Sequence, residues 1–195
     1  MRVSLLALVS VFCVLVNTGL ASAQDSDQYK PLFYLGGLIG AEGLIGMEED
    51  TPFNSQAFMY GATLKAFPWE RFGIGGTYTT GTHEEDDDFE GTAESDISTY
   101  TLDLMYVIKN KRDSKGYIVG FVGEAKEEAT VELNGFEAEG EAEVGTFGGG
   151  FGLLLADNSD GAGVGAGFEI RYYAFDGSEN ADGMLTLTFS LGLAF

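Results

Sequence analysis

The chain has 195 residues, of which 31 are Asp or Glu and 10 are Lys or Arg, giving a formal charge of −21. This length suits one domain with a hydrophobic core and is short for two, and the negative charge disfavours nucleic acid as a partner because phosphates would be repelled. With 45% hydrophobic and 13% aromatic residues, the chain also lacks the composition of a disordered acidic protein. One ordered, acidic domain is therefore expected.

The first 23 residues have the three parts of a secretory signal peptide. Arg2 supplies the positive charge, residues 3–16 are mostly apolar, and residues 21–23 (Ala-Ser-Ala) offer the small side chains that signal peptidase requires. An uncleaved membrane anchor is disfavoured because the apolar run is short for a span. We expect residues 1–23 to be removed and residues 24–195 to form one exported domain. The only cysteine, Cys13, would leave with the signal, so no disulfide is expected.

The rest of the chain alternates large apolar residues with small or polar ones, a period of two that is typical of β-strands. In the closing segment, large residues from Leu185 to Phe195 share one parity, and Thr, Ser, Gly and Ala occupy the other. No apolar stretch after the signal is long enough for a membrane helix. The alternation predicts eight strands, at about 32–42, 58–67, 72–79, 100–108, 117–124, 145–153, 164–173 and 185–195.

The connections between these strands fall into two alternating classes. Residues 68–71, 109–115 and 156–161 are short and turn-like, whereas residues 43–55, 83–96, 126–143 and 176–183 are longer and acidic. Short turns at one end and long loops at the other are typical of bacterial outer-membrane barrels. A soluble barrel fits less well, because a glycine-rich face would not fill its core. The prediction is an all-β fold, an eight-stranded antiparallel up-and-down transmembrane β-barrel.

Aromatic residues sort toward the two ends of the predicted strands, as expected for girdles at the membrane interfaces. The clearest candidates for interface aromatics are Trp69, Phe72, Tyr106, Tyr117 and Tyr172.

The closing segment also resembles a known family signature. An alternating strand with a terminal phenylalanine is similar to the C-terminal signature of Gram-negative outer-membrane proteins, carried here by Phe189, Leu191, Leu193 and Phe195. Residues 65–76 resemble the second hairpin of the eight-stranded OmpA/OmpX-like and opacity-type barrels. The resemblance implies residence in a Gram-negative outer membrane, contact with its lipid and lipopolysaccharide, and insertion by periplasmic chaperones and the barrel-assembly machinery. Cell-wall anchoring is not expected, because no peptidoglycan-binding module follows as in full-length OmpA.

Three positive and three negative residues fall on the parity assigned to the barrel lumen. Buried charges are tolerated only when they are paired, so an ion-pair network is expected. It would act either as a plug or as a gated polar path, and the narrow lumen of an eight-stranded barrel favours the plug. Arg171 is the predicted hub, because a guanidinium can bridge two carboxylates. The predicted network is Lys65, Asp103, Glu124, Lys126, Glu169 and Arg171.

The acidic connections suggest two further interactions. One is a weak divalent-cation site, since hard cations bind clustered carboxylates. A solvated acidic loop without a bound metal is the favoured interpretation. The other follows from Asn134-Gly135, which predicts a hairpin raised above the membrane. Its edge could capture a partner strand, but its glutamates favour protection against such pairing. The candidate cation residues are Glu84, Glu85, Asp86, Asp87 and Asp88.

Catalysis and cofactors are not expected. His83 is the only histidine and is assigned to an acidic loop, no Gly-x-Ser-x-Gly motif occurs, and no histidine is expected to reach Ser190 on the lumen face. The favoured function is a monomeric barrel with a structural or surface-interaction role, through long acidic extracellular loops and an ion-paired, largely plugged lumen. The alternative is a small-solute, porin-like channel.

Overall fold

The computed structural model describes residues 31–45, 56–87, 91–111, 114–133, 136–157, 161–176 and 183–195. The predicted signal peptide lies outside these ranges, so the division of the chain at residue 23 remains a prediction. Within the described ranges, the strands are β1 (Leu32–Ile45), β2 (Gln56–Phe67), β3 (Phe72–Asp87), β4 (Gly91–Lys111), β5 (Ser114–Leu133), β6 (Phe136–Ala156), β7 (Gly163–Asp176) and β8 (Gly183–Ala194).

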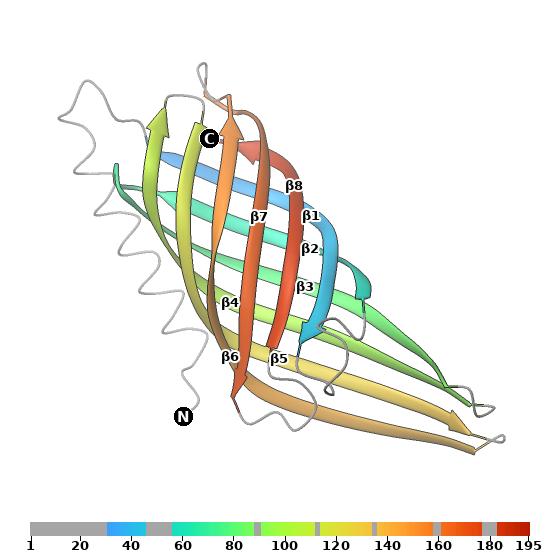
Figure 1. The fold of residues 1–195 in the computed structure, drawn as a ribbon. Helices are drawn as coiled ribbons and strands as arrows, with labels where there is room; N and C mark the ends of the chain where they lie inside the picture. Colours follow the sequence, from blue (N-terminus) through green and yellow to red (C-terminus); the bar gives the residue numbers. More distant parts are fainter. Residues whose placement is uncertain are drawn as a thin grey trace, which may run out of the picture.

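These strands form one closed barrel (Figure 1). Each strand pairs antiparallel with its neighbour in the chain, and β8 pairs with β1. The closing seam continues to the last residue, since Phe33 and Phe195 exchange backbone hydrogen bonds of 3.0 and 2.9 Å. Closure removes the free edges from the barrel wall and pairs its backbone polar groups, which a bilayer core requires. The predicted eight-stranded antiparallel barrel is confirmed.

No helix among the described residues is both long and apolar enough to cross a membrane.

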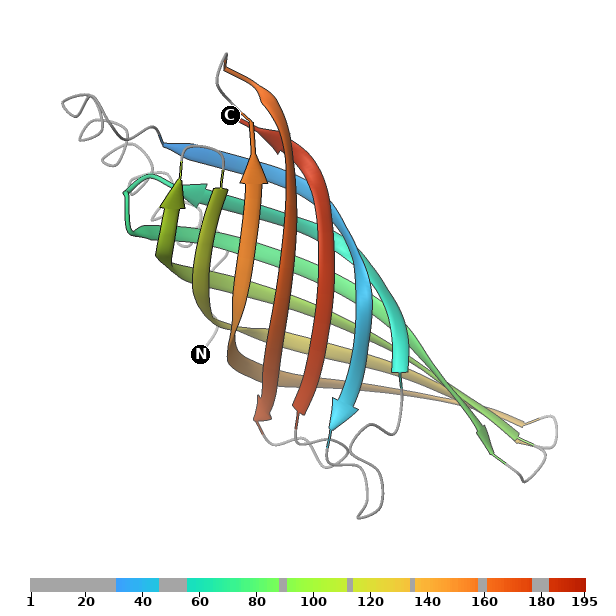
Figure 2. The ribbon, with the colours of Figure 1, turned by 45° about the horizontal axis from the view of Figure 1, so that its top comes forward.

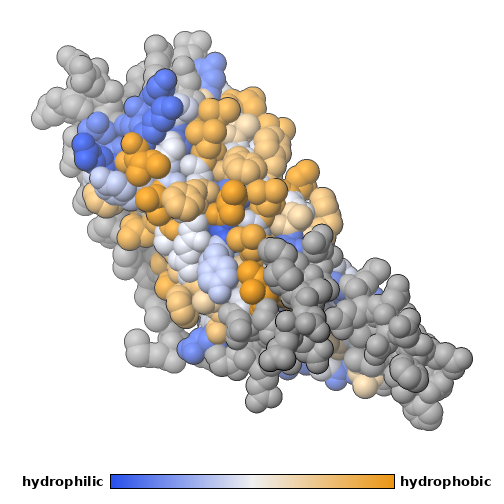
Figure 3. All heavy atoms as spheres, viewed as in Figure 1, coloured by the Kyte–Doolittle hydropathy of each residue, from blue (hydrophilic) through white to orange (hydrophobic). Residues whose placement is uncertain are grey.

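The barrel wall is apolar on its outer face. The large residues of β8 that carry the closing signature point outward and are about half exposed, and the bulky residues of β4 and β6 do the same. Figure 3 shows these hydrophobic residues as a band across the barrel, with hydrophilic residues gathered at one end. Such a band is the surface that a barrel presents to lipid.

The orientation expected for β5 is wrong. Tyr117, Val119 and Phe121 point into the barrel, whereas Ile118 and Val122 point outward. The reason lies on β6, which lines the interior with glycines. A Cβ atom at Gly152 would overlap the Tyr117 ring, and one at Gly148 would lie 2.7 Å from Cζ of Phe121. The two rings of β5 therefore fill space that β6 leaves empty.

Two of the four acidic connections are mostly strand rather than loop. β3 and β4 stay paired as far as Asp87 and Gly91, and β5 and β6 as far as Leu133 and Phe136. β4 and β5 also pair to their ends, with Gly91 opposite Leu133. Strands β3–β6 thus continue beyond the barrel as one four-stranded sheet, which Figure 2 shows as a projection away from the short turns. The long connections predicted at 83–96 and 126–143 are therefore wrong over their described residues. Residues 88–90 and Asn134-Gly135 lie outside the described residues.

Candidate functional site

Arg171, on β7, lies at the centre of a charged cluster inside the barrel. Its Nη1 and Nη2 donate to Oδ1 and Oδ2 of Asp103 at 3.0 and 2.7 Å, and its Nε donates to Oε2 of Glu169 at 3.1 Å. The side chains of Arg171, Asp103 and Glu169 are 1%, 0% and 5% exposed. The guanidinium therefore bridges two carboxylates away from water, the geometry in which charge-assisted hydrogen bonds are strongest.

Other polar groups supply the remaining hydrogen bonds and charge contacts of the Asp103 and Glu169 carboxylates. Thr77 and Thr101 donate to Asp103 at 2.9 and 2.8 Å. The Tyr117 hydroxyl donates to Oε1 of Glu169 at 2.6 Å, and Lys65 Nζ lies 3.4 Å from Oε2 of the same residue. The cluster holds two cations and two anions, so its formal charge is zero. Full pairing of this kind is what makes buried charge tolerable.

The register of the strands explains why these long side chains fit at one level. Gly75 on β3 stands between Lys65 and Asp103, pairing with both. On the other side, Gly150 and Gly152 of β6 stand opposite Arg171 and Glu169. Residues without side chains thus flank the charged ones. The glycines leave the interior space that the guanidinium, the ammonium group and the carboxylates occupy.

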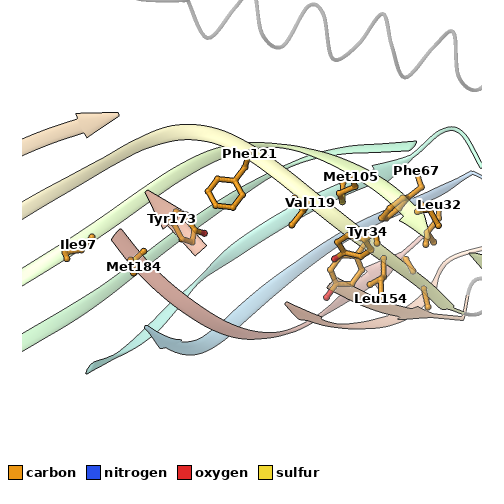
Figure 4. Packing of buried hydrophobic residues seen from close by; sticks show 14 of the residues in the cluster. Leu32, Tyr34, Phe67, Ile97, Met105, Val119, Phe121, Leu154, Tyr173 and Met184 are labelled. Carbon is orange, nitrogen blue, oxygen red and sulfur yellow. The ribbon is translucent and has the colours of Figure 1, made fainter. Parts of the chain in front are cut away.

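Apolar side chains enclose the cluster at both ends of the barrel interior. Figure 4 shows the buried hydrophobic residues in two groups, with Ile97, Met184 and Tyr173 toward one end and Phe67 and Leu32 toward the other. The Phe121 ring centroid lies 5.4 Å from Cζ of Arg171, in cation–π range. Exclusion of water by these layers strengthens the electrostatic interactions between them.

The structure brings together four of the six residues predicted for the network: Lys65, Asp103, Glu169 and Arg171. It does not bring in Glu124 or Lys126, because β5 faces the other way. Glu124 is exposed. Lys126 bonds to Glu128 at 2.5 Å and to Glu141 at 3.0 Å on the outer face of the projecting sheet. The hydrogen bond to Glu128 contributes most to raising the pKa of Lys126, and the one to Glu141 adds to it.

Three hydroxyl groups that bond to the network carboxylates were not predicted from the sequence. The predicted interface position of Tyr117 is wrong, because its side chain is buried in the barrel and bonded to Glu169. The position of Thr77 and Thr101 in the lumen could have been predicted, because both lie on the inward parity of their strands. Phe72, Tyr106 and Tyr172 do point outward, and Trp69 lies partly exposed in the turn before β3.

The only histidine also lies in the barrel interior and not in a loop. His83 belongs to β3, and its Nε2 is 3.0 Å from Oε1 of Glu42 on β1. Both side chains are buried. A Cβ atom at Gly81 would overlap the Glu42 carboxylate, so the glycine makes room for this contact. The pair links β1 to β3 across β2, near the point where the sheet leaves the barrel.

The candidate cation residues have only a partial description. Glu84–Asp87 belong to β3, and Asp88 lies outside the described residues. Cation binding by this run remains a prediction, as does recognition of the closing signature by assembly factors.

No family model matches the chain, and no curated protein matches its sequence. Solved structures do resemble it. Ail, the attachment invasion locus protein of Yersinia pestis, superposes with a TM-score of 0.53 at 14% identity, over 85% of this chain and 97% of that chain. Neisserial surface protein A (NspA) superposes with a TM-score of 0.53 at 11% identity, over 85% of this chain and 98% of that chain. This chain has the fold of the eight-stranded outer-membrane barrels.

A further similar structure contains a bound ligand. Ail was also crystallised in complex with the heparin analogue sucrose octasulfate, and that structure superposes with a TM-score of 0.52 at 13% identity, over 85% of this chain and 97% of that chain. The superpositions show a common fold. At such low sequence identity, a ligand bound by one barrel does not indicate a ligand of this one.

Proposed function

We propose that the chain is exported through a cleaved signal and resides, as a monomer, in the outer membrane of a Gram-negative cell, where it serves a structural or surface-interaction role. The short turns would face the periplasm and the projecting sheet the exterior. The observation that carries this proposal is the buried, fully paired charge layer across the lumen. A barrel whose interior is filled works through its outer surfaces. The proposal includes no catalytic step and no cofactor.

Burial of the charged network supports a plugged lumen. The network residues Lys65, Asp103, Glu169 and Arg171 come from three strands, β2, β4 and β7, and meet at one level. Each of these side chains is nearly inaccessible to water. A continuous aqueous path would leave part of such a layer exposed. Opening one would require breaking several charge-assisted hydrogen bonds at once, which is costly in a low-dielectric interior. The plugged barrel is therefore favoured over the small-solute channel.

Electrical recording tests this choice. We expect the full barrel, refolded into planar bilayers, to give no discrete conductance steps at moderate voltage, because the charge layer blocks ions. Insertion must be verified independently, by the shifted gel mobility of the unheated barrel and by protease protection. Regular single-channel steps from inserted protein would contradict the plug and favour the porin-like alternative.

The projecting sheet supplies the surface for interaction. Its outer face continues the parity that faces lipid lower down, but the residues change from apolar to acidic. Lys126 is the only base among the described residues of this face, and Glu128 and Glu141 pair with it. The exposed acids are Glu94, Asp96, Glu124, Glu128, Glu139, Glu141 and Glu143. A face of this charge favours cationic partners and repels polyanions of the kind found bound to Ail.

The two edges of the sheet are a less favoured docking route. Among the described residues, no strand is paired along the outer edge of β3 beyond Gly81 or along that of β6 before Gly145. Exposed edges can accept an added strand. Glu139, Glu141 and Glu143 lie along the β6 edge and disfavour pairing with another acidic chain. We therefore assign the interaction to the face, with the edge charges as protection.

Binding of a cationic probe tests the acidic face. We expect a short oligolysine to bind the full barrel in neutral detergent at low salt, and 0.5 M salt to abolish the binding by screening. Changing Glu139, Glu141 and Glu143 to Gln should weaken oligolysine binding about tenfold, because it removes three exposed charge interactions that are each worth a few tenths of a kcal/mol. The control is Glu70→Gln, which removes an exposed acid at the opposite end of the barrel. Equal affinity for both variants would contradict the assignment.

A further inference from the structure

The basic residues of the chain concentrate at the short-turn end of the barrel. Five of the 10 Lys and Arg residues lie at position 71 or within residues 109–115, around the turns that join β2 to β3 and β4 to β5. Figure 3 shows hydrophilic residues gathered over this end, where β4 meets β5 in Figure 1. The concentration stands out in a chain with a formal charge of −21.

A β-bulge places one of these bases on the outer wall of the barrel. Val107 pairs with Tyr117 but Lys109 pairs with Gly116, so Ile108 is the extra residue. Gly116 shares the outward parity of β5, and a Cβ atom there would lie 3.4 Å from Cβ of Lys109 and 3.9 Å from Cγ1 of Ile108. Bulges re-aim side chains in this way. Lys109 therefore stands beside the exposed Ile108, at the edge of the apolar band.

Hydrogen bonds order the turn that supplies a second base. The Val107 amide donates to the Arg71 carbonyl at 2.9 Å, and Asn110 Nδ2 donates to the Glu70 carbonyl at 3.3 Å. The Arg71 guanidinium donates to the Tyr106 hydroxyl at 3.5 Å, on the outer face. The β2–β3 turn is thus fastened to the end of β4, and the guanidinium is held next to the aromatic band.

The resulting surface combines cations with apolar groups. Arg71, Lys109 and Lys111 are exposed, as is Glu70 beside them. These four described residues carry a formal charge of two positive units. Phe72 and Tyr106, in edge contact with a centroid distance of 5.4 Å, and the exposed Ile108 lie directly toward the apolar band. The cations match the negatively charged headgroup of an anionic lipid, and the neighbouring aromatic and aliphatic side chains match its acyl chains.

We propose that Arg71, Lys109 and Lys111, with the Tyr106 hydroxyl, bind the phosphate headgroup of an anionic phospholipid in the leaflet at the short-turn end, while its acyl chains lie against Phe72 and Ile108. The guanidinium and ammonium groups donate to phosphate oxygens, and the aromatic rim sits at headgroup depth. The site rests on the proposed membrane orientation. It deepens that function by naming a lipid that this end of the barrel selects.

The only tryptophan of the chain reports on this site, because Trp69 lies in the same turn as Arg71. The full barrel is reconstituted in phosphatidylcholine containing a fixed fraction of either brominated phosphatidylcholine or brominated phosphatidylglycerol. Bromine quenches tryptophan at short range, so the quenching ratio gives the relative occupancy of the two lipids near Trp69. We expect phosphatidylglycerol to be enriched about threefold, and 0.5 M salt to reduce the enrichment.

Charge variants test whether these bases cause the enrichment. The triple variant Arg71→Gln, Lys109→Gln and Lys111→Gln should bring the ratio to unity, and the pair Lys109→Glu and Lys111→Glu should invert it. Lys126→Gln, which removes one positive charge at the opposite end, should leave it unchanged. A wild-type ratio of one, or enrichment that survives in the triple variant, would overturn the proposal.

Two further measurements separate the sources of failure. Phosphate and chloride buffers of equal ionic strength should give the same ratio; loss of enrichment in phosphate alone would identify a site for free phosphate and overturn the lipid assignment. Absence of quenching by either brominated lipid, together with unshifted gel mobility, would mean that the chain does not insert. That result would contradict the proposed function itself.

Discussion

Replacing Arg171 with alanine is expected to lower the free energy of unfolding of the barrel by about 3–5 kcal/mol, because it leaves two buried carboxylates without their shared cation. Asp103 would keep only the hydroxyls of Thr77 and Thr101. Glu169 would keep Lys65 and Tyr117. Reversible urea unfolding in lipid bilayers, followed by Trp69 fluorescence, measures the change. The same variant should also give conductance steps that the wild type lacks, since water must hydrate the exposed acids.

A charge-balanced variant separates loss of the ion pair from loss of packing. Arg171→Met keeps most of the side-chain volume and removes the charge. Adding Asp103→Leu removes the opposite charge and leaves Lys65 paired with Glu169. The double variant should therefore be more stable than Arg171→Met alone, as expected for replacement of a whole buried pair. If Arg171→Ala unfolds at the wild-type urea concentration, Arg171 is not the hub of the network.

Replacing Gly148 with valine is expected to prevent formation of the closed barrel. Gly148, on β6, stands opposite Phe121 and Tyr173, whose ring centroids are 4.5 Å apart. A Cβ atom there would overlap the carbonyl oxygen of Tyr172 and crowd the Phe121 ring. A backbone atom cannot rotate away as a side chain can, so β6 and β7 would have to separate. The cost exceeds the roughly 1–3 kcal/mol of ordinary core overpacking.

The same strand offers a matched control. Gly140 lies on the projecting part of β6, where a Cβ atom would meet nothing within 4 Å. Gly140→Val should change stability by no more than about 0.5 kcal/mol, as for other surface positions. Gel mobility of unheated samples and circular dichroism in bilayers distinguish the two outcomes. A folded Gly148→Val barrel with wild-type mobility would contradict the close approach of β6 and β7.

The charged cluster was within reach of sequence reasoning only in part. Asp103, Glu169 and Arg171 could be assigned to the lumen because their strands have one clearly bulky face, which fixes the other face as inward. Glu124 and Lys126 could not, because β5 carries large residues on both parities. Which set turns inward depends on the glycines of β6, a strand about 30 residues further along the chain. The contact between His83 and Glu42 could not be predicted from the sequence either, since the two residues are 41 positions apart in the chain.

The number of strands, their antiparallel order and the apolar band that faces outward could all be predicted from the sequence alone. These properties follow from local rules: a period of two sets the strand, and a short connection between neighbouring strands sets their antiparallel order. Three features became visible only in the folded barrel: which face of β5 fills the lumen, which four charges meet, and how far β3–β6 extend beyond the barrel wall. Each of these depends on what a neighbouring strand contributes at the same level, and closure of the barrel fixes that register across the whole chain.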